Sequence, residues 1–202
     1  MIFNKILPAV TLAASLLALP ALAQNVVGSS QVDGQKVELL EDNTWRYAAE
    51  VAPGCDSIAM GVSFCYPAGQ WQGSPPPGPD ITAAYRHDDR HFAQFIIEAI
   101  GADDGANANM MRKIVVQNAA AATGQSMSDI PTLAIEEAMI AGKNAETIVY
   151  KVNFDGVSVV FANSILIEKT QMMQAMTYAL GTDFSAKHKA LHAQFLEDIQ
   201  MN

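Results

Sequence analysis

The chain has 202 residues, half of them hydrophobic and 16% charged, and its formal net charge is −9 at pH 7. This length is enough for one compact domain with a core of its own. Binding to nucleic acid or to an anionic membrane surface relies on clustered Lys and Arg, so the acidic excess argues against both functions.

The first 23 residues predict an export signal. A short basic start ends at Lys5, an apolar run covers Ile6–Leu19, and Pro20–Ala23 ends in the small-x-small pattern that a signal peptidase cleaves. The run is shorter than the roughly 20 apolar residues that span a bilayer, which favours a cleaved signal over a retained anchor. We therefore predict cleavage between Ala23 and Gln24 and a periplasmic or secreted product. That product keeps 11 Lys and Arg against 21 Asp and Glu, a net charge of −10.

Residues 24–48 predict a small β-meander. Short β-favouring runs are separated by Asp33-Gly34 and Asp42-Asn43, and such pairs tolerate the positive φ of tight hairpin turns. Residues 49–54 contain Pro53-Gly54 and indicate a linker. The main domain is expected over residues 55–202.

The main domain is predicted to be an antiparallel sheet with helices. We expect strands over residues 58–66, 81–86, 92–100, 133–140, 146–154, 157–167 and 171–180, the last four consecutive and antiparallel. Apolar residues at helical spacing predict one helix over 107–123, ended by Gly124, and another that begins at a Thr182 cap and reaches Ile199. The fold class is α+β: an antiparallel sheet of about six to seven strands, two principal helices and the N-terminal meander.

The order of these segments and the chemistry of their turns resemble the PsbP-like (DcrB-type) α/β/α sandwich superfamily over about residues 55–201. The segments that carry the resemblance are Gly61–Pro67 with Trp71, Tyr85–Ile97, Ala145–Lys151 and Ser185–Ile199. Members of that superfamily are mostly binding or assembly factors without catalytic residues. The resemblance therefore implies a fold and a binding role, and it implies no site residue. Separately, Asp33–Trp45 resembles a short hairpin element of exported bacterial proteins.

The sequence contains no HExxH, GxSxG, CxxC or Gly-rich phosphate-binding motif. We predict a non-enzymatic binding or assembly module without a cofactor. It would recognise another periplasmic or envelope protein, or a small apolar ligand in the cleft between sheet and helix. Two alternatives stay open: a hydrolase of an unfamiliar type, for which no nucleophile is nominated, and a histidine-based metal-binding protein.

Two histidine pairs are the candidate metal ligands. His87 and His91 bracket two aspartates at a predicted hairpin tip, and His188 and His192 lie four residues apart on the predicted last helix. Imidazole and carboxylate groups bind Zn²⁺ and Cu²⁺ in proteins. A charged turn and an ordinary partly buried histidine explain the same residues, so the sequence assigns no metal site and leaves both pairs as candidates.

The two cysteines, Cys55 and Cys65, predict a structural disulfide. An exported chain meets an oxidising compartment, in which paired cysteines form persistent disulfides. Nine intervening residues do not form the CxxC motif of redox centres, and none of the four histidines is near in sequence to complete a zinc site. The alternative of two free thiols is left to experiment.

Overall fold

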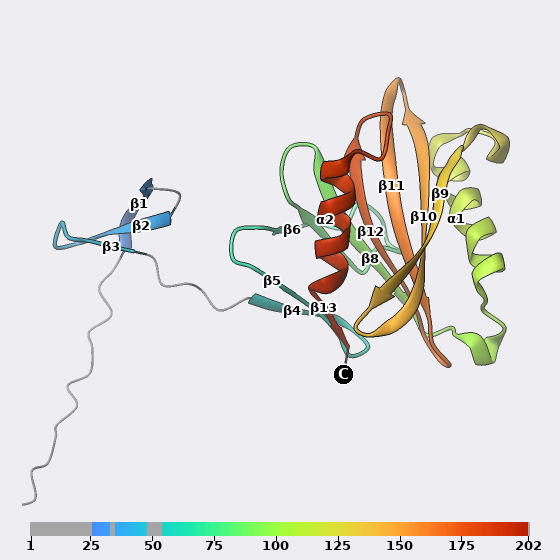
Figure 1. Cartoon of the computed structure of the whole chain (residues 1–202), viewed down its shortest axis with the longest axis horizontal. Coiled ribbons are helices and arrows are strands. Elements are labelled where there is room, and N and C mark those ends of the chain that lie inside the picture. The colour runs from blue at the N-terminus through green and yellow to red at the C-terminus, as the bar shows by residue number, and fades with distance from the viewer. Residues whose placement is uncertain (1–25, 33–34, 48–53, 202) are drawn as a thin grey trace, which may run out of the picture. The chain divides into compact units, whose positions relative to one another are not determined.

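The computed structural model describes residues 26–32, 35–47 and 54–201, in two units that divide between residues 49 and 50. The predicted signal peptide, residues 1–23, and residues 49–53 of the predicted linker lie outside the described residues. Figure 1 shows the elements of both units, and each unit is described by itself.

The first unit is a three-stranded antiparallel sheet in the order β1-β2-β3. Its strands are β1 (Val26–Val32), β2 (Gln35–Leu40) and β3 (Trp45–Tyr47). Asn43 has a φ of 62° in the turn before β3, where the Asp42 carboxylate accepts a hydrogen bond from the Thr44 amide at 2.9 Å. This sheet is the small meander that the fold-class prediction contains.

The second unit is built on a seven-stranded antiparallel sheet in the order β6-β7-β8-β12-β11-β10-β9. Its strands are β6 (Gln72–Ser74), β7 (Ala83–Arg86), β8 (His91–Glu98), β9 (Thr132–Ile140), β10 (Lys143–Phe154), β11 (Val157–Ile167) and β12 (Met172–Leu180). Two-residue turns at Ala141-Gly142 and Asp155-Gly156 join β9 to β10 and β10 to β11. Both residues of each pair have positive φ, as a type I′ turn requires.

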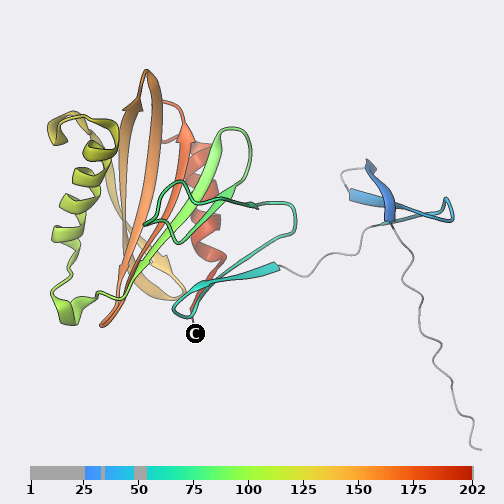
Figure 2. The same ribbon diagram turned by 180° about the vertical axis from the view of Figure 1, so that it is seen from behind.

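Two helices cover opposite faces of this sheet, α1 (Ala108–Thr123) and α2 (Ala186–Glu197) (Figures 1 and 2). Successive strand residues point to opposite faces, so Ile148 on β10 joins the apolar cluster under α1 while the adjacent Thr147 faces α2. The α+β class, the sheet and both principal helices are thus confirmed. Two short 3₁₀ turns flank α1, namely η1 (Ala102–Asp104) and η2 (Met127–Asp129).

The predicted end of α1 agrees with the structure, whereas the predicted cap of α2 does not. Asn107 caps α1, since its side chain accepts a hydrogen bond from the Met110 amide, and Gly124 ends the helix with a φ of 65°. For α2 the predicted cap, Thr182, is wrong. Ser185 is the N-cap, and its side chain accepts from the amide of His188, so the helix begins three residues later than expected.

The strand predicted over residues 58–66 is also wrong, because the chain reverses within it. Met60 and Gly61 have φ of 48° and 79° and form a tight turn between β4 (Gly54–Ala59) and β5 (Val62–Tyr66). With β13 (Ile199–Met201) these strands make a second, three-stranded sheet in the order β13-β5-β4. Residue Gly54, assigned to the linker, is the first residue of β4.

Aromatic side chains fill the core between this small sheet, α2 and the main sheet. Phe64 on β5 lies at its centre and is fully buried. Its ring contacts five other aromatic rings with centroid separations between 4.7 and 6.0 Å, those of Tyr66, Trp71, Tyr85, Phe95 and Phe195. Among the described residues no helix is both long and apolar enough to span a membrane.

Candidate functional site

The two cysteines lie directly opposite each other in the β4–β5 hairpin. Their sulfur atoms are 2.11 Å apart, which fits the expected disulfide. The amide of Cys65 also donates to the carbonyl of Asp198 at 2.8 Å, just after α2. The pair therefore closes the hairpin beside the C-terminal end of that helix.

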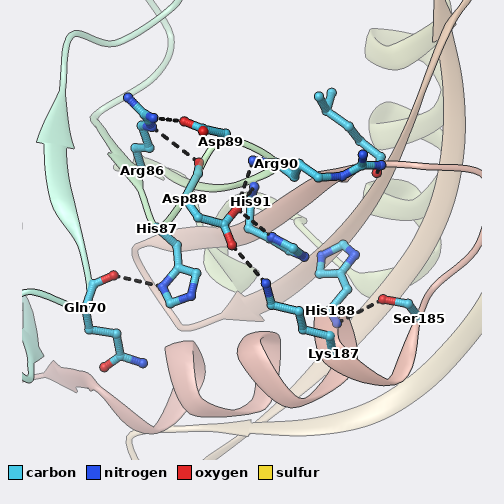
Figure 3. Close-up of polar contacts among 11 residues, drawn as sticks. Gln70, Arg86, His87, Asp88, Asp89, Arg90, His91, Ser185, Lys187 and His188 are labelled. Carbon is cyan, nitrogen blue, oxygen red and sulfur yellow. Dashed lines mark hydrogen bonds and ion pairs between the residues drawn. The ribbon is translucent and has the colours of Figure 1, made fainter. Parts of the chain in front are cut away.

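All four histidines lie in one region, because each pair that the sequence suggested stays close in space and His91 of one pair lies next to His188 of the other. His87 and His91 belong to the β7–β8 hairpin, and His188 and His192 to α2. The ring of His91 lies 6.2 Å from that of His87 and 6.2 Å from that of His188, measured between centroids. Figure 3 shows the His91 and His188 rings next to each other. The hairpin tip thus packs over the start of α2.

Asp88 ties the hairpin tip to α2 (Figure 3). Its carboxylate accepts hydrogen bonds from the Arg90 amide at 2.8 Å, from His91 Nδ1 at 2.8 Å and from Lys187 Nζ at 2.9 Å. Burial raises the pKa of Asp88, but the bonds from Lys187, His91 and Arg90 together outweigh it and hold the pKa below its usual range. The carboxylate is therefore ionised, with its partners already in place.

The remaining imidazole of the hairpin is also bonded. His87 Nδ1 donates to the carbonyl of Gln70 at 2.8 Å, and its ring lies against Trp71. Within the described part of the chain, no group of three or more His, Cys, Asp or Glu side chains is arranged to hold a metal ion. Both histidine pairs stay candidates from the sequence, which assigned a metal to neither of them.

Beneath α2 runs a buried series of hydrogen bonds that we call the histidine–hydroxyl chain. Thr177 Oγ1 lies 2.9 Å from both His188 Nε2 and His192 Nδ1. The other nitrogen of His192 lies 2.8 Å from Ser164 Oγ, which is 2.6 Å from Thr147 Oγ1. These five side chains join α2 to three neighbouring strands, β12, β11 and β10.

Both histidines of this chain are neutral at neutral pH. Burial, together with the nearby His91, lowers the pKa of His188 to about 4, and burial, together with His188, lowers the pKa of His192 to about 3. Thr177 has a single hydroxyl proton and bonds both rings, so the tautomer of one histidine constrains that of the other.

Ser164 and His192 have the hydrogen-bond geometry of a nucleophile and its base. Ser164, however, has no exposed surface, and the second nitrogen of His192 meets Thr177 rather than a carboxylate. A substrate cannot reach the hydroxyl oxygen. The arrangement instead holds α2 on the sheet, since each buried hydroxyl and His192 have hydrogen-bond partners.

The sequence predictions missed Thr147, Ser164 and Thr177. A signal was present, because Ser164 and Thr177 are polar residues inside largely apolar strand runs. Buried strand positions with hydroxyl groups require partners. The partners, two histidines from a helix more than ten residues away, cannot be read from local sequence.

The sheet-facing side of α2 is filled by its own side chains. Leu191, Phe195 and Leu196 are buried and belong to the aromatic core. This packing occupies the place where the sequence prediction put a small apolar ligand.

The exposed outer edge of β9 has a different character. β9 is the last strand of the seven-stranded sheet, and Leu133, Ile135 and Met139 on it are 43%, 49% and 53% exposed. An irregularity in the pairing with β10 leaves Leu133 as an extra residue, a β-bulge. We call the regular stretch that follows, Ile135–Met139, the β9 edge. It is the second candidate site.

Comparison with known proteins identifies the fold. No protein-family model matches the sequence, and no curated protein matches it. The chain is similar in structure to cyanobacterial PsbP (CyanoP) from Synechocystis sp. PCC 6803, with 17% identity, 75% of this chain and 94% of that chain covered, and a TM-score of 0.55. It is also similar to a mutant of the protein Mog1, with 9% identity, 75% and 96% covered, and a TM-score of 0.50. The PsbP-like fold predicted from the sequence is confirmed over most of the chain.

Proposed function

We propose that this chain, which has a PsbP-like fold, is an exported non-enzymatic binding or assembly module whose partner is another protein of the periplasm or cell envelope. One observation carries the proposal. Large apolar side chains remain exposed on β9, which has no strand on its outer side among the described residues, while the space between α2 and the sheet is packed. Exposed apolar side chains that gather on one element typically mark a protein interface.

The arrangement of polar groups supports a binding role over catalysis. The Ser164–His192 pair is sealed beneath α2, and Asp88 is bonded to three partners at the hairpin tip. The module needs no cofactor. Because α2 packs closely on the sheet, a protein partner is favoured over the small apolar ligand.

The proposed compartment rests on two features. The first 23 residues have the pattern of a cleaved export signal. The sulfur atoms of Cys55 and Cys65 lie at bonding distance, and such a bond persists in an oxidising compartment. We therefore place the protein in the periplasm or outside the cell.

Photo-cross-linking in cell envelopes tests the proposal. A photoreactive amino acid is placed in turn at four exposed apolar positions in different parts of the second unit, namely Met60, Ile100, Ile135 and Phe154. The same envelope protein should be captured reproducibly from at least one position, and a heat-unfolded sample should not capture it. If no position captures a protein while native mass spectrometry finds a bound lipid-like molecule, the chain is a carrier of small ligands and the proposal is wrong.

A further inference from the structure

We infer that the β9 edge binds an extended segment of another protein by strand addition, with a Lys or Arg side chain of that segment next to Glu137. The inference rests on the proposed function and specifies its site and the chemistry of its partner.

The hairpin geometry fixes which backbone groups of β9 point outward. In a two-residue hairpin the residues that flank the turn, here Ile140 and Lys143, form a hydrogen-bonded pair. Such pairs recur at every second residue of an antiparallel ladder, so Ala138 and Glu136 bond to β10. The N–H and C=O groups of residues 135, 137 and 139 therefore point away from the sheet. They form the row that an added strand uses.

The side chains of these three residues lie on one face of the sheet. Ile135 pairs with Ile148, which belongs to the apolar cluster under α1, so this is the α1 face. Ile135 and Met139 flank Glu137 and are each about half exposed. Alternate side chains of an added strand would cover the two apolar groups, because cross-strand neighbours on one face come into contact.

Glu137 is the carboxylate that remains for a cation. Glu146, directly opposite on β10, is hydrogen-bonded to Arg112, and Glu136 on the other face is paired with Lys189. Within the described residues Glu137 has no ion pair. It lines a hollow with Met139, Asn144 and Glu146, among other residues. A Lys or Arg side chain that enters this hollow would meet the Glu137 carboxylate and the Asn144 amide oxygen.

The same charges argue against a second copy of the chain as the occupant. Antiparallel pairing of two β9 edges over their full length is centred on residue 137, which places Glu137 directly opposite Glu137 of the other copy. Like charges at directly opposite positions destabilise a strand pair, and each chain carries a net charge of −9. The bulge at Leu133 and the turn at Ala141 limit any shift of the register. A segment with a basic residue fits where a second copy does not.

Synthetic peptides test the inference. The probes are the end-blocked peptide Thr-Ile-Thr-Lys-Thr-Ile-Thr, its central-Glu counterpart, and a version of the first with N-methylated amides on its pairing edge. Chemical-shift mapping on the isotope-labelled protein should place the Lys peptide at residues 135, 137 and 139, with an affinity about tenfold above that of the Glu peptide. N-methylation should abolish binding, because it removes the ladder hydrogen bonds.

Variants provide the matched control. Glu137→Lys should reverse the preference between the Lys and Glu peptides. Glu98→Lys makes the same charge change at another exposed position and should leave the preference unchanged. The inference fails if millimolar Lys peptide shifts no resonance of the β9 edge, if N-methylation has no effect, or if Glu137→Lys keeps the original preference. In those cases envelope cross-links from Met60, Ile100 or Phe154 would still support the proposed function, so the two failures are distinguishable.

Discussion

The histidine–hydroxyl chain and the β9 edge both involve strands of the seven-stranded sheet, and their polar groups are arranged in opposite ways. Beneath α2, the hydroxyls of Thr147, Ser164 and Thr177 all have partners between 2.6 and 2.9 Å away, and none of these residues is exposed. Along the β9 edge, backbone donors and acceptors point outward beside exposed apolar side chains. The buried hydroxyl and imidazole groups therefore stabilise the fold, while the β9 edge offers outward-facing backbone groups and the Glu137 side chain to a partner.

The largest loss of stability is expected from a substitution at the centre of the aromatic core between α2, the small sheet and the main sheet. Phe64→Ala removes the ring that contacts five other aromatic residues and leaves a cavity, which should lower the free energy of unfolding by about 3–5 kcal/mol. The control is Phe154→Ala at a side chain that is 40% exposed, with an expected cost of about 1 kcal/mol or less. Urea unfolding compares the two variants, and equal losses would show that the core is not centred on Phe64.

Reduction of the disulfide tests the stability of the β4–β5 hairpin, which packs beside α2. Closing a loop of about 11 residues stabilises a protein by roughly 3 kcal/mol in the chain-entropy model. Reductant should therefore lower the melting temperature, and the unfolded, unreduced protein should show no reactive thiol. Two reactive thiols before reduction would contradict the bond between Cys55 and Cys65.

Acidification should weaken the same region. The folded-state pKa values of His188 and His192 are about 4 and about 3, against 6.5 as the ordinary value, so the unfolded chain binds more protons below that pH. The stability contributed by the two neutral histidines is fully present above pH 6.5 and is lost as the pH falls towards their folded-state pKa values. Between pH about 7 and about 5 the free energy of unfolding should fall by about 3–4 kcal/mol. Burial raises the pKa of Asp198, which acts in the opposite direction.

Histidine ring resonances give a direct measurement of this prediction. The rings of His188 and His192 should keep the chemical shifts of the neutral form down to pH about 5 in the folded protein. Titration of either ring near its ordinary pKa would contradict the buried, neutral state.

Removing the Thr177 hydroxyl measures how much the histidine–hydroxyl chain contributes to stability. Thr177→Val keeps the shape of the side chain but leaves one nitrogen of His188 and one of His192 without a partner, at a cost of about 2 kcal/mol. Thr170→Val, in the exposed turn between β11 and β12, is the matched control and should cost less than about 0.5 kcal/mol. Urea unfolding of both variants measures the difference. If Thr177→Val left the free energy of unfolding unchanged, the histidine–hydroxyl chain would add nothing to stability.

The sequence allowed most of the sheet to be predicted because its strands are long and end at strong turn signals. Asp155-Gly156 and Gly142 mark the ends of β10 and β9, and the observed strands begin and end within a few residues of the predicted ones. The turn at Met60-Gly61 was missed because methionine rarely adopts a positive φ. This error concealed the β4–β5 hairpin, in which Cys55 and Cys65 are direct neighbours.

The candidate sites were harder to predict for a topological reason. His91 and His188 are almost a hundred residues apart in sequence, and the order of strands in the sheet decides that they meet. In the same way, the strand over residues 133–140 was predicted, but its position at the edge of the sheet depends on how all seven strands are arranged. Periodicity gives an element and the face that it buries, and it does not give the neighbours of that element.

The smallest expected effect on stability is on the β9 edge, and a pair of identical substitutions on one strand isolates it. Ile135→Thr changes a half-exposed side chain and keeps a β-branched residue in the strand, so the free energy of unfolding should change by less than about 0.5 kcal/mol. Ile140→Thr makes the same change at a fully buried position, where a hydroxyl must be desolvated, and should cost about 1–3 kcal/mol. Binding of the Lys peptide should show the reverse order, because Ile135 contacts the added strand and Ile140 faces the core. If Ile135→Thr destabilised the protein as much as Ile140→Thr and left peptide binding intact, the exposed row on β9 would be part of the fold rather than a surface for a partner.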